Sequence, residues 1–212
     1  MTPAAKIESL QTVAPNVSRE TAERMLALES FFLKWARTIN LVSPNTLDEA
    51  WRRHFLDSAQ LWTWRDNTSS WFDLGSGSGF PALVLAVLEL GSGNKITLVE
   101  SNVKKSAFLR QAIGALGLNA EVLTQRVEEL DVVVFSKAGT TVTARAFAPL
   151  DRMLDWTKGF GGSSSRALLH KGRGFQGELD EARRRYAFDL VERTSLVDSE
   201  SVILDITAVR KL

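Results

Sequence analysis

Cysteine is absent from this chain of 212 residues. Its absence excludes disulfides, thiolate metal sites and a cysteine nucleophile. Histidine occurs only at His54 and His170, which leaves little room for a histidine-ligated metal or a catalytic triad, and we expect no metal. No apolar run approaches the roughly 18 residues of a membrane span, and residues 1–6 lack the apolar core of a signal peptide. We therefore expect a cytoplasmic protein that makes no contact with a membrane.

An excess of charge of one sign is also missing, because 26 Lys and Arg stand against 25 Asp and Glu. With a net charge of +1, any nucleic-acid surface must be a local basic patch. The composition, 44% hydrophobic and 24% charged, is ordinary for a globular protein. The length suffices for one core and a small extra subdomain. We expect a monomer.

Residues 1–66 have the pattern of a helical cap. A first helix covers residues 4–14 and ends near Pro15, and Ser18 can cap a second helix. Apolar residues of the second helix recur at spacings of three and four, which predicts a stripe that packs inward. They are Met25, Leu28, Phe32, Trp35 and Ile39. Thr46 and Glu49 form a capping box that opens a third helix, which runs on towards Trp64.

From residue 70 onward, strand-like and helix-like segments alternate, which predicts a doubly wound, Rossmann-like α/β sheet over residues 67–212. The predicted strands are 71–74, 95–100, 120–124 and 166–170, the predicted helices are 104–116, 150–156 and 178–186, and segments 190–195 and 202–209 close the sheet as an antiparallel hairpin. Segments 131–135 and 140–144 compete for the fourth strand. We prefer 140–144, for a reason given below. Cap and sheet are expected to form one compact unit.

A glycine-rich turn joins the first strand to the helix that follows it. Gly75, Gly77 and Gly79 let a ligand approach the backbone without meeting a Cβ atom, and Pro81 suits the first helical position. Open α/β sheets bind ligands at such turns. The spacing differs from the dinucleotide pattern G-x-G-x-x-G. Together with Asp73, it resembles the D-x-G-x-G motif of S-adenosylmethionine (SAM) methyltransferases. A dinucleotide, SAM and a purely structural turn remain open at this point.

Other candidate site residues follow the later strands. Glu100 closes the second strand, where a carboxylate can accept hydrogen bonds from both ribose hydroxyls. Val127 and Glu128 follow the third strand and suit an adenine contact through backbone N–H and the Glu128 side chain. Arg145 follows the fourth strand and cannot act as a base, but it can hold a carboxylate or a phosphate with two hydrogen bonds. Phe147 can stack on a base, although packing in the core is the favoured interpretation.

Basic residues predict a rim that contacts RNA phosphates on one face. Residues 166–185 hold six Lys and Arg and only three acidic residues. The predicted RNA-binding rim consists of Lys104, Lys105, Arg110, Lys171, Arg173, Arg183, Arg184 and Arg185. A solvated charged helix explains residues 183–185 equally well.

Motifs over nearly the whole chain resemble the GidB family of small-subunit ribosomal RNA guanine-N7 methyltransferases. The matching stretches are Asn40-Leu41, Arg53-His54-Phe55-Leu56-Asp57-Ser58, residues 73–81, Leu98-Val99-Glu100-Ser101, Lys104-Lys105, Phe108-Leu109-Arg110, Arg126-Val127-Glu128, residues 144–150 and Lys171-Gly172. In that family an Arg-Ala-Phe-Ala motif directly follows strand four, which is why we place this strand at residues 140–144. Two features depart from the family pattern: Ala82 replaces a usual glycine, and residues 131–139 look longer than usual.

The resemblance implies a SAM-dependent transfer of a methyl group to one guanine of 16S rRNA, within the small ribosomal subunit. Guanine N7 has a lone pair and no proton, so no general base is expected and Arg145 would position the reactants. The implied SAM-binding residues are Asp73, Gly75, Gly77, Phe80, Glu100, Val127, Glu128 and Arg145. The residues alone leave three alternatives: a SAM methyltransferase with another substrate, an NAD-dependent oxidoreductase, and a catalytically silent RNA-binding assembly factor.

Overall fold

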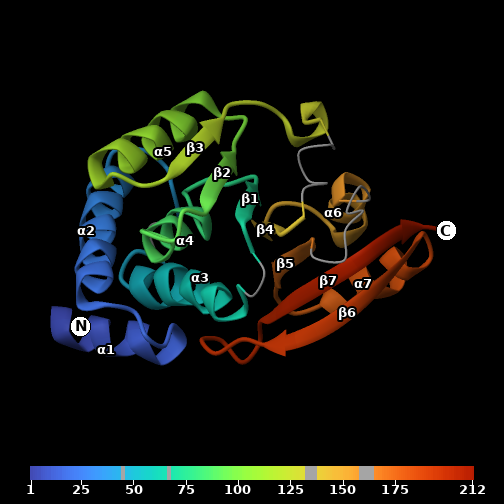
Figure 1. The fold of residues 1–212 in the computed structure, drawn as a ribbon, viewed down its shortest axis with the longest axis horizontal. Coiled ribbons are helices and arrows are strands. Elements are labelled where there is room, and N and C mark those ends of the chain that lie inside the picture. Colours follow the sequence, from blue (N-terminus) through green and yellow to red (C-terminus); the bar gives the residue numbers. More distant parts are fainter. Residues whose placement is uncertain (44–45, 66–67, 132–137, 158–164) are drawn as a thin grey trace.

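The computed structural model of the chain describes residues 1–43, 46–65, 68–131, 138–157 and 165–212. Within these residues a seven-stranded sheet has the order β3-β2-β1-β4-β5-β7-β6 (Figure 1). The strands are β1 (Ser70–Leu74), β2 (Lys95–Val99), β3 (Ala120–Leu123), β4 (Thr140–Arg145), β5 (Arg166–Lys171), β6 (Tyr186–Thr194) and β7 (Val202–Lys211). Strands β1 to β5 are parallel, whereas β7 pairs antiparallel with both β5 and β6. The predicted doubly wound sheet with a closing hairpin is confirmed.

Helices cover both faces of this sheet (Figure 1). They are α4 (Ala82–Leu88), α5 (Val103–Leu116), α6 (Leu150–Thr157) and α7 (Phe175–Arg183). The connections through α4 and α5 step from β1 towards β3, whereas α6 connects β4 to β5 in the opposite direction. Because crossovers between parallel strands are right-handed, α4 and α5 lie on one face and α6 on the other, with α7 packed beside α6.

The fourth strand is the one that the sequence analysis preferred. Strand β4 pairs with β1 along one side and with β5 along the other. Its residues from Thr140 to Ala144 are buried, as expected for the centre of a parallel sheet. The competing segment 131–135 lies, apart from Asp131, outside the described residues, as does most of the stretch 131–139 that looked long.

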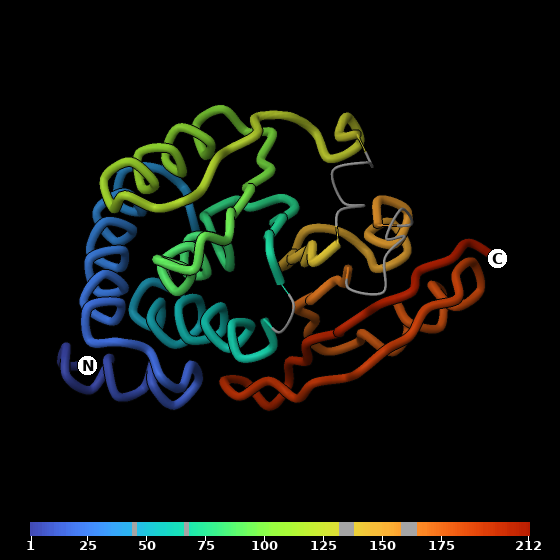
Figure 2. The backbone as a smooth tube through the Cα atoms, viewed as in Figure 1, coloured from blue at the N-terminus to red at the C-terminus, as the bar shows by residue number. Residues whose placement is uncertain are grey.

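Helix α2 (Arg19–Ala36) packs against α4 and α5, and the amino-terminal α1 (Pro3–Val13) packs against α2. Met25, Leu28 and Phe32 of the predicted stripe are buried there, in a core cluster that also contains residues of α4 and α5. Figure 2 shows the amino-terminal helices at one end of the molecule and the carboxyl-terminal hairpin at the other. The expected boundary at residues 66 and 67 itself lies outside the described residues.

The third helical segment begins later than its predicted capping box. It consists of a π-helical turn (Trp51–Leu56), the short α3 (Asp57–Ala59) and a 3-10 turn (Gln60–Trp64). The Thr46 hydroxyl donates to the carbonyl of Ser43 at 2.7 Å, and the cap position is Ala50, without a side-chain hydrogen bond. The capping box is therefore wrong, because the threonine stabilises the turn before the helix instead of capping the helix.

Two further boundaries near the carboxyl terminus differ from the prediction. Helix α7 starts at Phe175, since Gly174 has a left-handed φ of 87° that lets the chain turn just before it. Tyr186 was expected to end this helix, but it is buried and opens β6, where it pairs with Lys211. The charged residues before Tyr186 have a helical pattern that continues up to it, so the sequence does not show where β6 begins. Among the described residues, no helix has the length and apolar character that a bilayer crossing requires.

Candidate active site

The glycine-rich turn between β1 and α4 adopts a left-handed backbone. Gly75, Gly77 and Gly79 have φ values of 67°, 54° and 89°, which side chains with a Cβ atom rarely adopt. The turn is anchored to β2 by a hydrogen bond from Ser76 N to Val99 O of 2.9 Å. The backbone of this turn is therefore fixed at the carboxyl end of β1, with no side chains on its three glycines.

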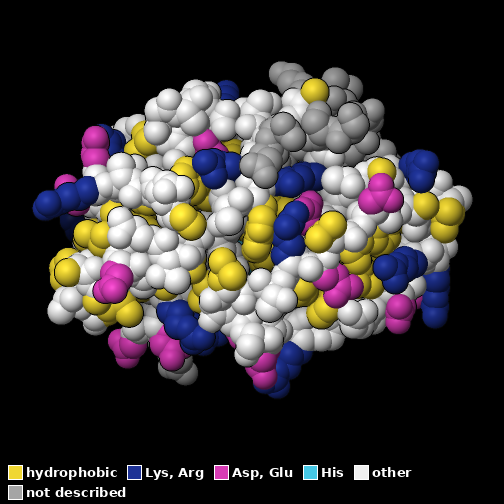
Figure 3. All heavy atoms as spheres, turned by 60° about the horizontal axis from the view of Figure 1, so that its bottom comes forward, with side chains coloured by type: hydrophobic (Ala, Val, Ile, Leu, Met, Phe, Trp, Pro, Cys, Tyr) yellow, Lys and Arg dark blue, Asp and Glu magenta, His cyan; other side chains and the backbone are white. Residues whose placement is uncertain are grey.

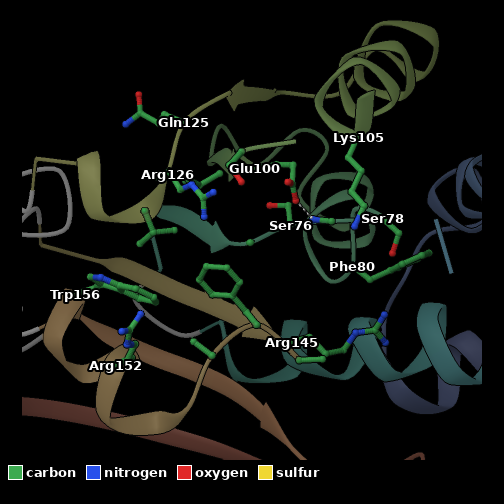
Figure 4. Close-up of a pocket in the computed structure, with 18 of the residues that line it drawn as sticks. Ser76, Ser78, Phe80, Glu100, Lys105, Gln125, Arg126, Arg145, Arg152 and Trp156 are labelled. Carbon is green, nitrogen blue, oxygen red and sulfur yellow. Dashed lines mark hydrogen bonds between the residues drawn. The ribbon is translucent and has the colours of Figure 1, made fainter. Parts of the chain in front are cut away.

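A cavity of about 650 Å³ lies above this turn. It sits where connections from β1 and β4 leave in opposite directions, which is the usual ligand position in open α/β sheets. Its labelled walls in Figure 4 are Ser76, Ser78, Phe80, Glu100, Lys105, Gln125, Arg126, Arg145, Arg152 and Trp156. The volume falls in the range of small-molecule sites. Gly75, Gly77, Val127 and Glu128 also line it, so the structure brings most of the predicted cofactor residues together.

Glu100 faces this cavity and binds the backbone of the glycine-rich turn. One carboxylate oxygen accepts a hydrogen bond from Gly77 N at 2.8 Å, and the other accepts one from Asn102 N at 2.7 Å. Asp73, in contrast, lies beneath the turn and does not line the cavity. Its carboxyl accepts a hydrogen bond from the Thr143 hydroxyl at 2.8 Å, and burial raises its pKa to about 7. The structure thus gives Asp73 a supporting position rather than a place on the wall.

The segment after β4 forms the opposite wall. Ala146 has a left-handed φ of 50°, which turns the chain so that the Phe147 ring lies over Gly75. A Cβ atom placed on Gly75 would stand 2.0 Å from this ring, and the ring centroid is 5.5 Å from that of Trp156. Phe147 is 39% exposed, so the favoured interpretation of a core phenylalanine is wrong. The left-handed turn at Ala146, which no sequence pattern predicts, places Phe147 on the cavity wall instead of in the core.

Arg145 leaves the sheet towards the third helical segment and is held there by several acceptors. Its Nη1 donates to the carbonyl of Arg53 at 2.9 Å and lies 3.4 Å from Asp57 Oδ2. Its Nη2 lies 3.0 Å from His54 Nδ1. The guanidinium also lies 5.4 Å from the centroid of the Phe80 ring, and Phe80 lines the cavity of about 650 Å³. Arg145 therefore joins the cap to the cavity.

Both histidines converge on this cluster, although neither had an assigned role. His170 Nε2 lies 3.0 Å from the Asp57 carbonyl and 3.6 Å from Asp57 Oδ2. Burial, with help from the positive charge of Arg145, lowers the pKa of His54 to about 4, and burial also lowers the pKa of His170. Both rings are then neutral near pH 7, and each holds one partner: His54 accepts from Arg145, and His170 donates to the Asp57 carbonyl.

Helix α6 contributes two cavity residues that the sequence analysis missed, Arg152 and Trp156. They stand four positions apart and so share one face of the helix. Met153 and Leu154 on the other face are buried. The sequence signal for this pair is that Arg152 and Trp156 lie on the face of α6 opposite its buried apolar residues. No group of three or more His, Asp or Glu is placed to hold a metal in the part of the chain described.

The predicted basic rim is not gathered in one place. Lys105 lines the cavity, and Lys104 is exposed beside it. Arg110 donates to the carbonyl of Val122 and to the Thr124 hydroxyl. Lys171 is largely buried and pairs with Glu178 at 2.6 Å, which leaves its charge less available to a phosphate.

Three of the four remaining rim residues are paired with acidic residues, and the fourth, Arg183, is exposed at the end of α7. Arg173 pairs with Glu200, and Arg184 pairs with Glu181. Arg185 pairs with Asp151 and Asp155. Figure 3 shows basic and acidic side chains interleaved on the face that it presents.

Two groups of rim residues, Lys171 with Arg173 and residues 183–185, lie near opposite ends of β7. Lys171 stands opposite Val202, where β7 begins, and Tyr186, next to Arg185, stands opposite Lys211, where it ends. At about 3.3 Å per residue, roughly 30 Å separates these two positions. The single rim expected from the sequence is therefore divided.

The strand order, the glycine turn and the cavity at the reversal of strand order define a Rossmann-like methyltransferase fold. The chain is similar in fold to a SAM-dependent methyltransferase from Aquifex aeolicus, with a TM-score of 0.54 and 15% identity over 80% of this chain and 96% of that chain.

A family model described as rRNA small subunit methyltransferase G matches residues 21–206. Curated relatives carry the same description. The protein from Brucella anthropi is 46% identical over 97% of this chain and 96% of the relative, and that from Brucella canis is 45% identical over the same shares. The chain therefore belongs to the rRNA small subunit methyltransferase G family, as the resemblance in its motifs implied.

Proposed function

We propose that this protein is a SAM-dependent methyltransferase that modifies guanine N7 in small-subunit rRNA. The observation that carries the proposal is the convergence of the glycine turn, Glu100 and the segment after β4 on one cavity, in a member of this family. The proposed substrate is 16S rRNA within the small ribosomal subunit, which agrees with the cytoplasmic location expected from the sequence.

The residues of the cavity fit SAM. The left-handed glycines keep the backbone bare where the methionyl part would pass, and a Cβ atom on Gly75 would clash with the Phe147 ring that packs over the turn. Glu100 already accepts two backbone hydrogen bonds, but a carboxylate has about four acceptor positions, so it can also accept from ribose hydroxyls. Val127 and Glu128 would contact the adenine. Arg145, whose guanidinium lies 5.4 Å from the centroid of the Phe80 ring, would hold the methionyl carboxylate.

When bound, SAM supplies an electrophilic methyl group on a sulfonium sulfur. Guanine N7 accepts this methyl with its own lone pair and releases no proton, so the site needs no general base. The residues around Arg145 suit this chemistry, because burial lowers the pKa of His54 and of His170 and makes both imidazoles poor proton acceptors. Orientation of the reactants is then the main contribution, and it can be worth about 7–11 kcal/mol.

Labelled methyl transfer to undermethylated small subunits, followed by mapping of the modified base, tests the proposal. We expect one labelled guanine, with the label at N7. Binding to subunits without transfer would favour a silent assembly factor, and transfer only to other acceptors would favour another substrate. Thermal stabilisation by S-adenosylhomocysteine but not by NADH is expected, whereas the reverse would favour an oxidoreductase.

A further inference from the structure

A second cavity of about 570 Å³ adjoins the cofactor cavity across the segment that follows β4. Arg145, Ala146 and Phe147 line both cavities, so this segment is their shared wall. The far side of the second cavity carries polar groups, among them Asp57 and His170. Asp57 does not line the cofactor cavity, but its Oδ2 lies 3.4 Å from Nη1 of Arg145, which lines both cavities.

We propose that the target guanine enters this second cavity and that Asp57 binds the base through its N1–H and N2–H groups. This inference rests on the proposed function and names the residue that selects the base. An ionised carboxylate only accepts hydrogen bonds, and guanine carries these two donors side by side. Adenine carries an acceptor at N1 and would be repelled. Recognition of splayed-out bases through this edge is common in RNA-binding proteins.

Asp57 is better placed for this role than Glu178, the other carboxylate of the cavity. Glu178 is held more tightly, because one of its oxygens accepts two short hydrogen bonds, from Leu150 N at 2.8 Å and from Lys171 Nζ at 2.6 Å. Asp57 uses Oδ1 for Gln60 at 2.9 Å, but the contacts of Oδ2 are long, 3.4 Å to Arg145 and 3.6 Å to His170. The Oδ2 atom therefore lacks a short partner and can accept from a base.

The geometry of a purine places N7 on the side away from N1 and N2. A guanine whose N1 and N2 meet Asp57 therefore directs N7 towards the border that the second cavity shares with the cofactor cavity. Phe147, half-exposed on the shared wall, offers a ring on which the base can stack. Methylation makes the guanine ring cationic, and a carboxylate at N1–H and N2–H stabilises this developing charge. Asp57 thus serves both base selection and the reaction.

The test compares undermethylated small subunits reconstituted with guanine or with hypoxanthine at the target position. Hypoxanthine keeps N7 and N1–H but lacks the N2 amino group. For the unchanged protein we expect kcat/KM to favour guanine by roughly tenfold to a hundredfold, the usual effect of a hydrogen bond to a charged group. Asp57→Asn should lower kcat/KM on guanine and bring the preference close to one. Glu178→Gln is the matched control and should keep the preference.

The preference is the ratio of kcat/KM on guanine to kcat/KM on hypoxanthine, measured with one protein preparation. An unfolded fraction of a variant lowers both values equally and leaves this ratio unchanged. Asp57→Ser provides a second variant for the same measurement. A merely structural role of Asp57 would lower both rates and leave the ratio unchanged, which would overturn the proposal. Equal rates of the unchanged protein on both bases, or loss of the preference in Glu178→Gln, would also overturn it. Absence of any transfer to guanine subunits would instead refute the proposed function itself.

Discussion

At the scale of single residues, the site depends on backbone that only glycine adopts without strain. Gly77 has a φ of 54° and faces the cavity, with nothing closer to an added Cβ atom than Gly75 O at 3.7 Å. Gly91 has a φ of 84°, and an added Cβ atom there would meet nothing within 4 Å. The two positions thus carry the same kind of strain, but only one lies in the site.

This pair gives the first prediction. Gly77→Val and Gly91→Val should each cost roughly 1–2 kcal/mol in stability, because an L residue pays about this much in the left-handed region. Only Gly77→Val should lose SAM binding in calorimetry, since its side chain enters the space of the cofactor. An unchanged SAM affinity would mean that the turn is only structural.

Arg145 gives the second prediction. Its Nη1 and Nη2 reach different acceptors on the third helical segment, and a lysine cannot reproduce this planar fork. Arg145→Lys should therefore weaken SAM binding and turnover at least tenfold, a loss of about 1.4 kcal/mol or more, while the far-UV circular dichroism stays native. If SAM binding survives and turnover falls, Arg145 serves the guanine. Wild-type values of both would show that the active site is misplaced.

Asp73 gives a prediction on pH. Its pKa of about 7 in the folded state lies above the ordinary 3.8 because the carboxyl is buried, so the folded protein binds this proton more tightly than the unfolded chain. The resulting stability is fully present below pH 3.8 and is lost as the pH rises to about 7. Asp73→Asn removes this titration. Its stability relative to wild type should rise with pH by up to about 1.4 kcal/mol per pH unit and then level off.

Urea unfolding of both proteins between about pH 4 and pH 8 measures this difference. The titration of His54, which has the opposite sign because its pKa is lowered, is common to both proteins and cancels. A difference that does not change with pH would contradict the burial of an ionisable Asp73 carboxyl.

At the scale of elements, the start of α5 places two lysines beside the cavity. Asn102 caps this helix and accepts hydrogen bonds from the backbone N–H groups of Lys104 and Lys105. Their position at the cavity mouth makes them the part of the divided rim that RNA in the site can reach. The residues at the end of α7 lie far from it, and Arg184 and Arg185 already have acidic partners.

The double variants Lys104→Ala/Lys105→Ala and Arg184→Ala/Arg185→Ala separate these two surfaces. Each lost phosphate contact lowers the salt slope of binding by roughly 0.7 to 0.9. We expect the lysine pair to lower the slope by about one to two, and the arginine pair to leave it near wild type. Filter binding of small subunits over a range of salt gives both slopes. A lowered slope for the arginine pair alone would show that the RNA lies on α7 instead.

At the scale of the whole molecule, the cap and the sheet share one hydrophobic core. Phe32 of α2 is 1% exposed, and its ring lies 5.1 Å from Phe80 of the glycine turn and 6.0 Å from Phe55. We therefore propose that residues 1–66 and 67–212 unfold together. The contact with Phe80 also couples the cap to the cofactor cavity.

Phe32→Ala tests this coupling. Removal of a buried phenylalanine costs about 3–5 kcal/mol, and the loss should appear in one transition when tryptophan fluorescence and far-UV circular dichroism are followed together. SAM affinity should fall as well, because Phe80 loses a neighbour. Two separate transitions, with the sheet unaffected, would show that the cap is an independent domain.

The sequence by itself determined the sheet, the glycine turn and the line of site residues at the strand ends. Periodicity and turn chemistry are local, and the carboxyl ends of parallel strands must meet at one edge. That is why the sequence alone predicts Gly75, Glu100, Val127 and Arg145 as site residues, and all four line one cavity.

Only the tertiary structure decided what surrounds Arg145. Its contacts reach back 91 positions to His54 and 88 to Asp57, and His170 joins Asp57 across 113 positions. Such contacts depend on how the cap packs against the sheet, and no local pattern encodes that packing. The same holds for the divided basic rim, because strand pairing, which is a long-range property, places Lys171 and Arg185 near opposite ends of β7.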